Sequence, residues 1–112
     1  MITSVGLQYA KALFDLGSEK HLENVYYNYL QMVCNILNEN KDILKVLSHP
    51  SIKLEERKNI LRTSFQDYVN EEFLHFLFVL IDNFRLEEIS DMLDSYEYYL
   101  NLSNNICNVL SL

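Results

Sequence analysis

The chain has 112 residues and a formal net charge of −7, with nine lysine and arginine residues against sixteen aspartate and glutamate residues. This length predicts one domain with a sizeable core. The acidic balance without any basic run argues against a nucleic-acid-binding surface or a surface for anionic lipids, and leaves a small helical RNA-binding domain as a weak alternative. The two cysteines, Cys34 and Cys107, fit neither a disulfide framework nor a metal-ligand spacing, and we expect reduced thiols in a cytoplasmic protein.

The first predicted helix, Thr3 to Leu16, is apolar around about 220° of its circumference, where a core-facing helix needs roughly 100°. One apolar stripe consists of Val5, Tyr9, Ala12 and Leu16, and a second consists of Leu7, Ala10 and Phe14, with Leu13 between them. We expect either more of the same domain or a helix of a partner to cover the stripe that the core leaves free. Gly17 is expected to end the helix in the left-handed conformation, and Ser18 to cap the next helix.

Five further helices are predicted at Glu19 to Asn38, Lys41 to Leu47, Leu54 to Phe65, Glu71 to Asn83, and Leu86 to about Leu102. Asn40 and Asn70 are expected to cap the helices that follow them. The predicted fold is all-α, a compact six-helix bundle formed by residues 1–103.

The fourth helix is expected to turn its aliphatic and aromatic side chains inward and its charged side chains to solvent. The inward set is Leu54, Ile60, Leu61 and Phe65, and the solvent set is Glu55, Glu56, Arg57, Lys58 and Arg62.

The last residues, 104–112, are expected to form a linker and the start of a truncated C-terminal domain. Residues 101–105 are polar, and residues 106–112 form a short apolar run with β-branched side chains, which favours a strand. A naturally short chain is the alternative.

The fifth helix, like the first, has apolar side chains outside its expected core face. Val79 lies on a polar face with Glu72, His75 and Asn83, and Phe76 lies at the border of that face. A single exposed valine is ordinary on a protein surface. The functional interpretation is that Val79 and Phe76 form one wall of a groove, with the stripe of Val5, Tyr9, Ala12 and Leu16 as the other wall, suited to an amphipathic helix.

The sequence predicts no catalytic, cofactor-binding or metal site. The three histidines, His21, His49 and His75, lie on separate segments without the spacing of zinc ligands. Two glycines do not make a phosphate-binding loop. No signal peptide is evident, and the apolar stretch 73–84 is too short to span a bilayer, so no direct membrane insertion is expected.

Several motifs resemble those of one family. The run Tyr9-Ala10-Lys11-Ala12-Leu13-Phe14-Asp15-Leu16 is similar to the opening signature of the delta subunit of the bacterial F-type ATP synthase, a relative of the mitochondrial oligomycin-sensitivity-conferring protein. Further similar segments follow in order at Leu47-Ser48-His49-Pro50, Glu55-Glu56-Arg57-Lys58 and Leu80-Ile81-Asp82-Asn83-Phe84-Arg85-Leu86. Phe84 departs from the family pattern, which often has a small or basic residue there.

The resemblance implies a structural role without catalysis. In this family the N-terminal domain is a six-helix bundle of the peripheral stalk, the stator that keeps the catalytic head from turning with the rotor. Its first and fifth helices bind the helical N-terminus of an alpha subunit at the top of the head. The matching positions are Tyr9, Ala12 and Val79; for Tyr9 and Ala12 the alternative is plain packing within the bundle.

The partner-binding prediction therefore comprises Val5, Tyr9, Ala12, Leu16, Phe76, Val79 and Asn83. The resemblance also implies a grip on the b-subunit dimer through the missing C-terminal domain, and a peripheral location in the ATP synthase complex at the cytoplasmic face of the bacterial cell membrane. The alternative is a helical adaptor that binds another amphipathic helix and is unrelated to ATP synthase.

Overall fold

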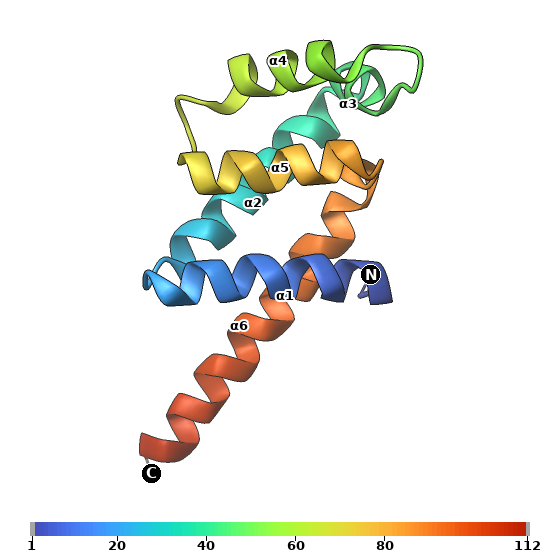
Figure 1. Ribbon diagram of the computed structural model, residues 1–112. Helices are drawn as coiled ribbons and strands as arrows, with labels where there is room; N and C mark the ends of the chain where they lie inside the picture. Colours follow the sequence, from blue (N-terminus) through green and yellow to red (C-terminus); the bar gives the residue numbers. More distant parts are fainter. Residues whose placement is uncertain (1, 112) are drawn as a thin grey trace.

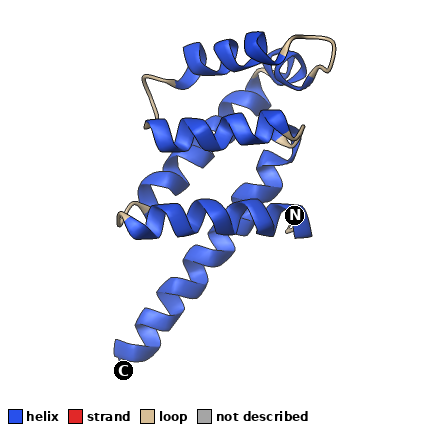
Figure 2. Cartoon of the chain, viewed as in Figure 1, coloured by secondary structure: helices blue, strands red, loops and turns tan. Residues whose placement is uncertain are grey.

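The computed structural model describes the backbone of residues 2–111 and the side chains of residues 2–103. The helices are α1 (Ser4–Glu19), α2 (Glu23–Glu39), α3 (Lys41–Ser48), α4 (Leu54–Phe65), α5 (Glu71–Asp82), the short 3-10 helix η1 (Leu86–Glu88) and α6 (Ile89–Ser111). Short loops join them, and residues 2–111 contain no strand (Figure 2). The prediction of an all-α six-helix bundle is confirmed. No helix within the described part of the chain is long and apolar enough to cross a membrane.

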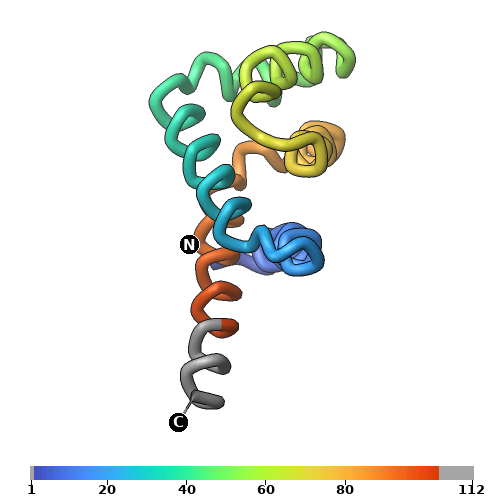
Figure 3. The backbone as a smooth tube through the Cα atoms, turned by 90° about the vertical axis from the view of Figure 1, so that its left-hand side faces the viewer, coloured from blue at the N-terminus to red at the C-terminus, as the bar shows by residue number. Residues whose placement is uncertain are grey.

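The helices form two layers. α1 and α5 lie side by side in one layer and cross α2 and α6, which form the other (Figures 1 and 3). α1 packs most closely on α6 and α2, whereas α5 packs on α4 and η1. The core between the layers is fully buried and centres on Tyr26, Leu30, Phe73, Leu77 and Tyr96.

The two glycines of α1 serve close helix packing. A Cβ atom at Gly6 would lie 2.9 Å from the backbone oxygen of Asp91 and 2.9 Å from the Ser95 hydroxyl oxygen, both on α6. A Cβ atom at Gly17 would lie 3.2 Å from the Tyr26 ring. Larger residues at either position would push neighbouring elements away from α1.

The prediction that Gly17 ends the first helix was wrong. Gly17 lies inside α1, and His21 adopts the left-handed conformation with φ 58°. The backbone N–H of Leu22 donates to the Gly17 carbonyl at 2.7 Å, and that of His21 donates to the Ser18 carbonyl at 3.3 Å, which is the Schellman pattern. Ser18 does not cap α2, since its N-cap is Leu22 without a side-chain hydrogen bond.

Of the two predicted asparagine caps, one is confirmed and the other is not. Asn70 Oδ1 accepts from the Phe73 backbone N–H at 2.8 Å, so its prediction as the cap of α5 is confirmed. Asn40 precedes α3 but makes no cap with its side chain there. Its amide donates instead to the Ile36 carbonyl at 2.9 Å and so satisfies the end of α2.

The predicted faces of α4 were partly wrong. Leu61 and Phe65 are buried, but Leu54 and Ile60 are 38% and 36% exposed. Arg57, expected in solvent, is only 5% exposed. Its Nε donates to the Ile52 carbonyl at 3.0 Å, and its guanidinium lies 5.0 Å from the Phe84 ring centroid.

Aromatic rings on and after α5 explain this orientation of α4. Phe84 has φ 55° and ends α5 in the left-handed conformation, which turns its ring toward Arg57. Lys58 and Arg62 lie over the Phe78 ring at 5.7 and 5.3 Å. Cations with long apolar stems pack well on aromatic faces, so they replace aliphatic residues in this contact.

The expected end of the last helix near Leu102 was also wrong, because α6 continues to Ser111 through the segment predicted as a linker and a strand. That segment contains neither glycine nor proline, and an isolated strand lacks a partner to satisfy its backbone groups. The domain boundary after residue 103 stays a prediction. Cys34 is a buried free thiol, and Cys107 lies outside the residues whose side chains are described.

Candidate functional site

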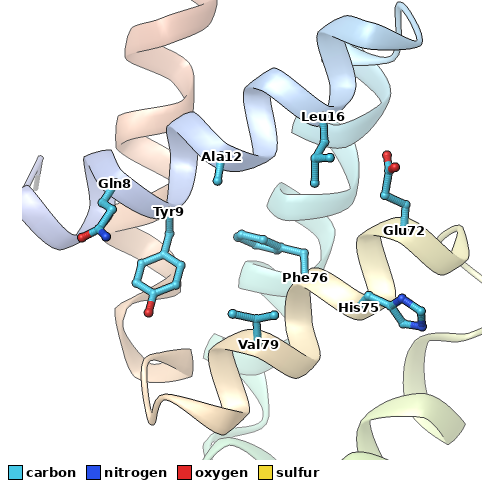
Figure 4. A pocket seen from close by; sticks show the side chains of 8 residues that line it. All are labelled: Gln8, Tyr9, Ala12, Leu16, Glu72, His75, Phe76 and Val79. Carbon is cyan, nitrogen blue, oxygen red and sulfur yellow. The ribbon is translucent and has the colours of Figure 1, made fainter.

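An open groove of about 400 Å³ lies between α1 and α5. Its lining residues are Gln8, Tyr9, Ala12 and Leu16 from α1, and Glu72, His75, Phe76 and Val79 from α5 (Figure 4). Tyr9, Ala12 and Leu16 point from α1 toward α5, and Phe76 and Val79 point back toward α1. The groove therefore has an apolar centre that is open to solvent.

The structure brings together five of the seven predicted partner-binding residues in this groove. They are Tyr9, Ala12, Leu16, Phe76 and Val79. Val5 is half-buried and lies outside the lining. Asn83 also lies outside it, but its Nδ2 donates to the Tyr9 hydroxyl at 3.1 Å and so links α5 to α1 at one end of the groove.

Three lining residues were missed by the sequence-based set. Gln8 precedes Ala12 by four positions, and His75 and Glu72 precede Val79 by four and seven, so each shares a helix face with a predicted residue. The helical spacing therefore carried the signal. Their polarity had suggested a solvated surface instead.

The apolar centre is buried on its lower side and accessible on its upper side. Phe76 is 7% exposed, and its ring packs on Phe73 with 5.8 Å between the centroids. Val79, in contrast, is 44% exposed, and Ala12 is exposed too. The single methyl group of Ala12 leaves room between the two helices, where a larger side chain would fill the groove.

Glu72 forms a fixed negative charge at the end of the groove near Leu16. The buried Tyr26 donates its hydroxyl to Glu72 Oε1, and Lys20 Nζ lies 3.1 Å from Glu72 Oε2. Asn70 Nδ2 donates in turn to the Tyr26 hydroxyl oxygen at 3.1 Å. The hydrogen bonds from Tyr26 and Lys20 lower the pKa of Glu72, which therefore stays ionised at neutral pH. Burial and the hydrogen bond to Glu72 raise the pKa of Tyr26 to about 12.

His75 forms the outer edge of the groove. Its Nε2 lies 3.7 Å from Glu71 Oε2, and its ring lies 5.9 Å from the Phe78 ring. The side chain is 67% exposed and points away from the apolar centre (Figure 4).

The site is suited to binding by shape and burial. Among the described residues, no group of three or more histidine, cysteine or acidic side chains is placed to hold a metal ion. An apolar groove between two helices, with hydrogen-bonding groups at its ends, matches the helix-in-groove mode of recognition.

Comparisons with known proteins point to one family. The sequence profile of the ATP synthase delta (OSCP) subunit family matches residues 5–110. The chain is 34% identical over 94 residues to ATP synthase subunit delta of Alkalihalophilus pseudofirmus, which covers 84% of this chain and 52% of the relative. It is 34% identical over 107 residues to ATP synthase subunit delta of Clostridioides difficile, covering 95% and 59% of the two chains. The chain spans little more than half the length of these curated relatives.

Proposed function

The chain belongs to the ATP synthase delta (OSCP) subunit family, and we propose that its α1–α5 groove binds the helical N-terminus of an alpha subunit. The domain then belongs to the peripheral stalk of a proton-translocating F-type ATP synthase and sits at the top of the catalytic head. The observation that carries the proposal is the apolar groove itself, which this chain leaves open between Ala12 and Val79.

The dimensions of the groove fit one short helix. The stretch from Tyr9 to Leu16 on α1 is about 11 Å long at 1.5 Å per residue, which corresponds to two helical turns. A bound helix presents anchors at i, i+3, i+4 and i+7 over that length. Such anchors would cover Phe76 and Val79 and bury the stripe of α1 that the helices among the described residues leave open.

The proposed role is mechanical and needs no catalytic group. A stator must hold the head against the torque of the rotor, so its binding domain has to be rigid and its groove well filled. The two-layer bundle supplies the rigid support under Phe76. We propose further that a C-terminal domain grips the b-subunit dimer, and that the complex lies at the cytoplasmic face of a bacterial membrane.

The test is a titration of the domain with a synthetic peptide of the cognate alpha subunit's N-terminal segment, followed by amide NMR shifts. We expect shifts concentrated on α1 and α5. Ala12→Asp places a charge in the apolar groove and should weaken binding by at least tenfold. Asn28→Asp on the exposed face of α2 is the matched charge control and should bind as the wild type does.

Amide spectra of both variants establish that they remain folded. Absence of binding to the wild-type domain at high micromolar peptide would overturn the proposal and favour a helical adaptor for another partner. Binding with shifts away from α1 and α5 would overturn the assignment of the groove.

A further inference from the structure

We infer that the α1–α5 groove selects a helix that carries a lysine or arginine at one end of its apolar face, and that this side chain binds Glu72. The inference rests on the proposed function, because it describes the occupant of the same groove. It adds the charge of the occupant, the end at which that charge lies and the residue that recognises it.

The Glu72 carboxylate is held in place before any partner arrives. One oxygen accepts from the Tyr26 hydroxyl, whose ring is fully buried and packs on Phe73 with 5.7 Å between the centroids. Asn70 fixes the same hydroxyl from the other side. The position of the charge is thus set by the core, and little side-chain entropy is lost when a cation binds to it.

Glu72 keeps free capacity toward the groove. An ionised carboxylate has about four acceptor sites, of which Tyr26 and Lys20 use two. The Glu72 side chain is 25% exposed, whereas that of Lys20 is 55% exposed. An ion pair as open as this one adds little stability, so an incoming cation can share the carboxylate or displace Lys20.

The two ends of the groove differ in charge. At the far end the Tyr9 hydroxyl and the Asn83 amide pair with each other and are neutral. Among the lining residues that the structure describes, Glu72 carries the one carboxylate. Among these lining residues a basic side chain finds a carboxylate only at Glu72, which it shares with or takes from Lys20, and this asymmetry sets the direction and register of the bound helix.

The positions of these side chains along the groove define the partner further. The Asn83 amide donates to the Tyr9 hydroxyl at one end of the groove. Leu16 lies beside Glu72 at the other end (Figure 4). The apolar anchors of the bound helix lie between these ends. Its basic residue lies about two turns from the anchor that contacts Tyr9.

The test compares two neighbouring carboxylates on α5. Glu72→Gln removes the charge but keeps an acceptor for the Tyr26 hydroxyl, so the fold is retained. Glu71→Gln removes the same charge one residue earlier. Glu71 lies outside the groove and pairs with Arg62 at 3.2 Å and with His75, at the outer edge of the groove, at 3.7 Å. The probes are the cognate alpha-subunit N-terminal peptide and versions in which each lysine or arginine is replaced singly by glutamine, and calorimetry gives Kd.

We expect Glu72→Gln to weaken binding of the unmodified peptide about three- to tenfold, and Glu71→Gln by less than about twofold. One of the single lysine or arginine replacements in the peptide should weaken binding as much as Glu72→Gln does. The same replacement should weaken binding no further when the domain already carries Glu72→Gln. Lys20→Gln should strengthen binding of the unmodified peptide, because Glu72 loses its own cation.

The failures are distinguishable. Tight binding of a cognate peptide that has no basic residue, or equal effects of Glu72→Gln and Glu71→Gln, would overturn this inference and leave the proposed function standing. No binding of any peptide to the wild-type domain would overturn the proposed function and the inference with it.

Discussion

α1 carries two stripes with the same spacing on adjacent faces, and the described residues of this chain cover only one of them. The covered stripe is Gly6, Ala10, Leu13 and Gly17, all buried against neighbouring helices. The open stripe is Val5, Tyr9, Ala12 and Leu16, each one residue earlier, all half-buried or exposed. The residues i, i+4, i+7 and i+11 recur in both, so periodicity alone does not tell which stripe the core takes.

Side-chain size separates the two stripes. The covered stripe has glycine at both ends, where the Asp91 backbone and the Tyr26 ring approach α1 closely. The open stripe has a tyrosine and a leucine on either side of Ala12, which leaves a hollow with apolar walls. Small residues in the covered stripe let helices of the same chain approach α1. In the open stripe, Ala12 leaves space for a further helix.

The largest contrast is expected from truncating one leucine of each stripe. Leu13 is fully buried, so Leu13→Ala should lower the free energy of unfolding by about 2–5 kcal/mol through lost burial and the cavity left behind. Leu16 lines the open groove, and Leu16→Ala should cost less than about 1 kcal/mol. Urea unfolding followed by circular dichroism measures both. Equal losses would break the comparison, because Leu16 would then belong to the core.

The second comparison uses substitutions that add volume to each stripe. Gly6→Ala should lower the free energy of unfolding by about 1–3 kcal/mol, although alanine favours helix, because the Asp91 backbone oxygen cannot move aside alone. Ala12→Leu adds more volume to the open stripe and should change stability by less than about 0.5 kcal/mol. The same urea titrations apply. A Gly6→Ala variant as stable as the wild type would show that α6 yields at the crossing with α1.

The positions of the helices could be predicted from the local sequence pattern. The side chains that end or orient some of these helices could not. α4 was predicted with its observed bounds because its apolar periodicity involves only neighbouring residues. The burial of Arg57 depends on Phe84, twenty-seven positions further on, whose left-handed conformation turns its ring onto the guanidinium. His21 ends α1, whereas Gly17 lies inside the helix where the Tyr26 ring packs against it. Such long-range contacts lie beyond periodicity.

The groove between α1 and α5 could be predicted from the sequence. Val79 and the stripe of Ala12 were apolar where a monomer needs no apolar surface, and this excess marked both walls. Glu72 was missed because a carboxylate in the first turn of a helix already has a reason to be there in the helix dipole. Its place at the end of the groove, held by the Tyr26 hydroxyl, became visible only in the fold.

Tyr26 contacts both the covered stripe of α1 and the end of the open groove. Removal of its hydroxyl is expected to give the smallest of the three predicted changes in stability. Its ring packs on Gly17 at the end of the covered stripe, while its hydroxyl donates to Glu72 at the end of the open one. Tyr26→Phe keeps the ring and should lower the free energy of unfolding by about 1 kcal/mol at pH 7. Urea unfolding at several pH values between 3 and 7 measures the difference.

The pH dependence identifies the cause of that loss. Because the Tyr26 hydrogen bond lowers the pKa of Glu72 below its usual 4.5, the ionised carboxylate stabilises the fold above that pH, and the stabilisation disappears as the pH falls through the folded-state value. The gap between wild type and Tyr26→Phe should therefore narrow below about pH 4.5. Glu72→Gln, the control, should show a flatter acid slope than the wild type. A gap that stays constant down to pH 3 would mean that the hydroxyl stabilises the covered stripe without reaching the groove, and the two regions would be independent.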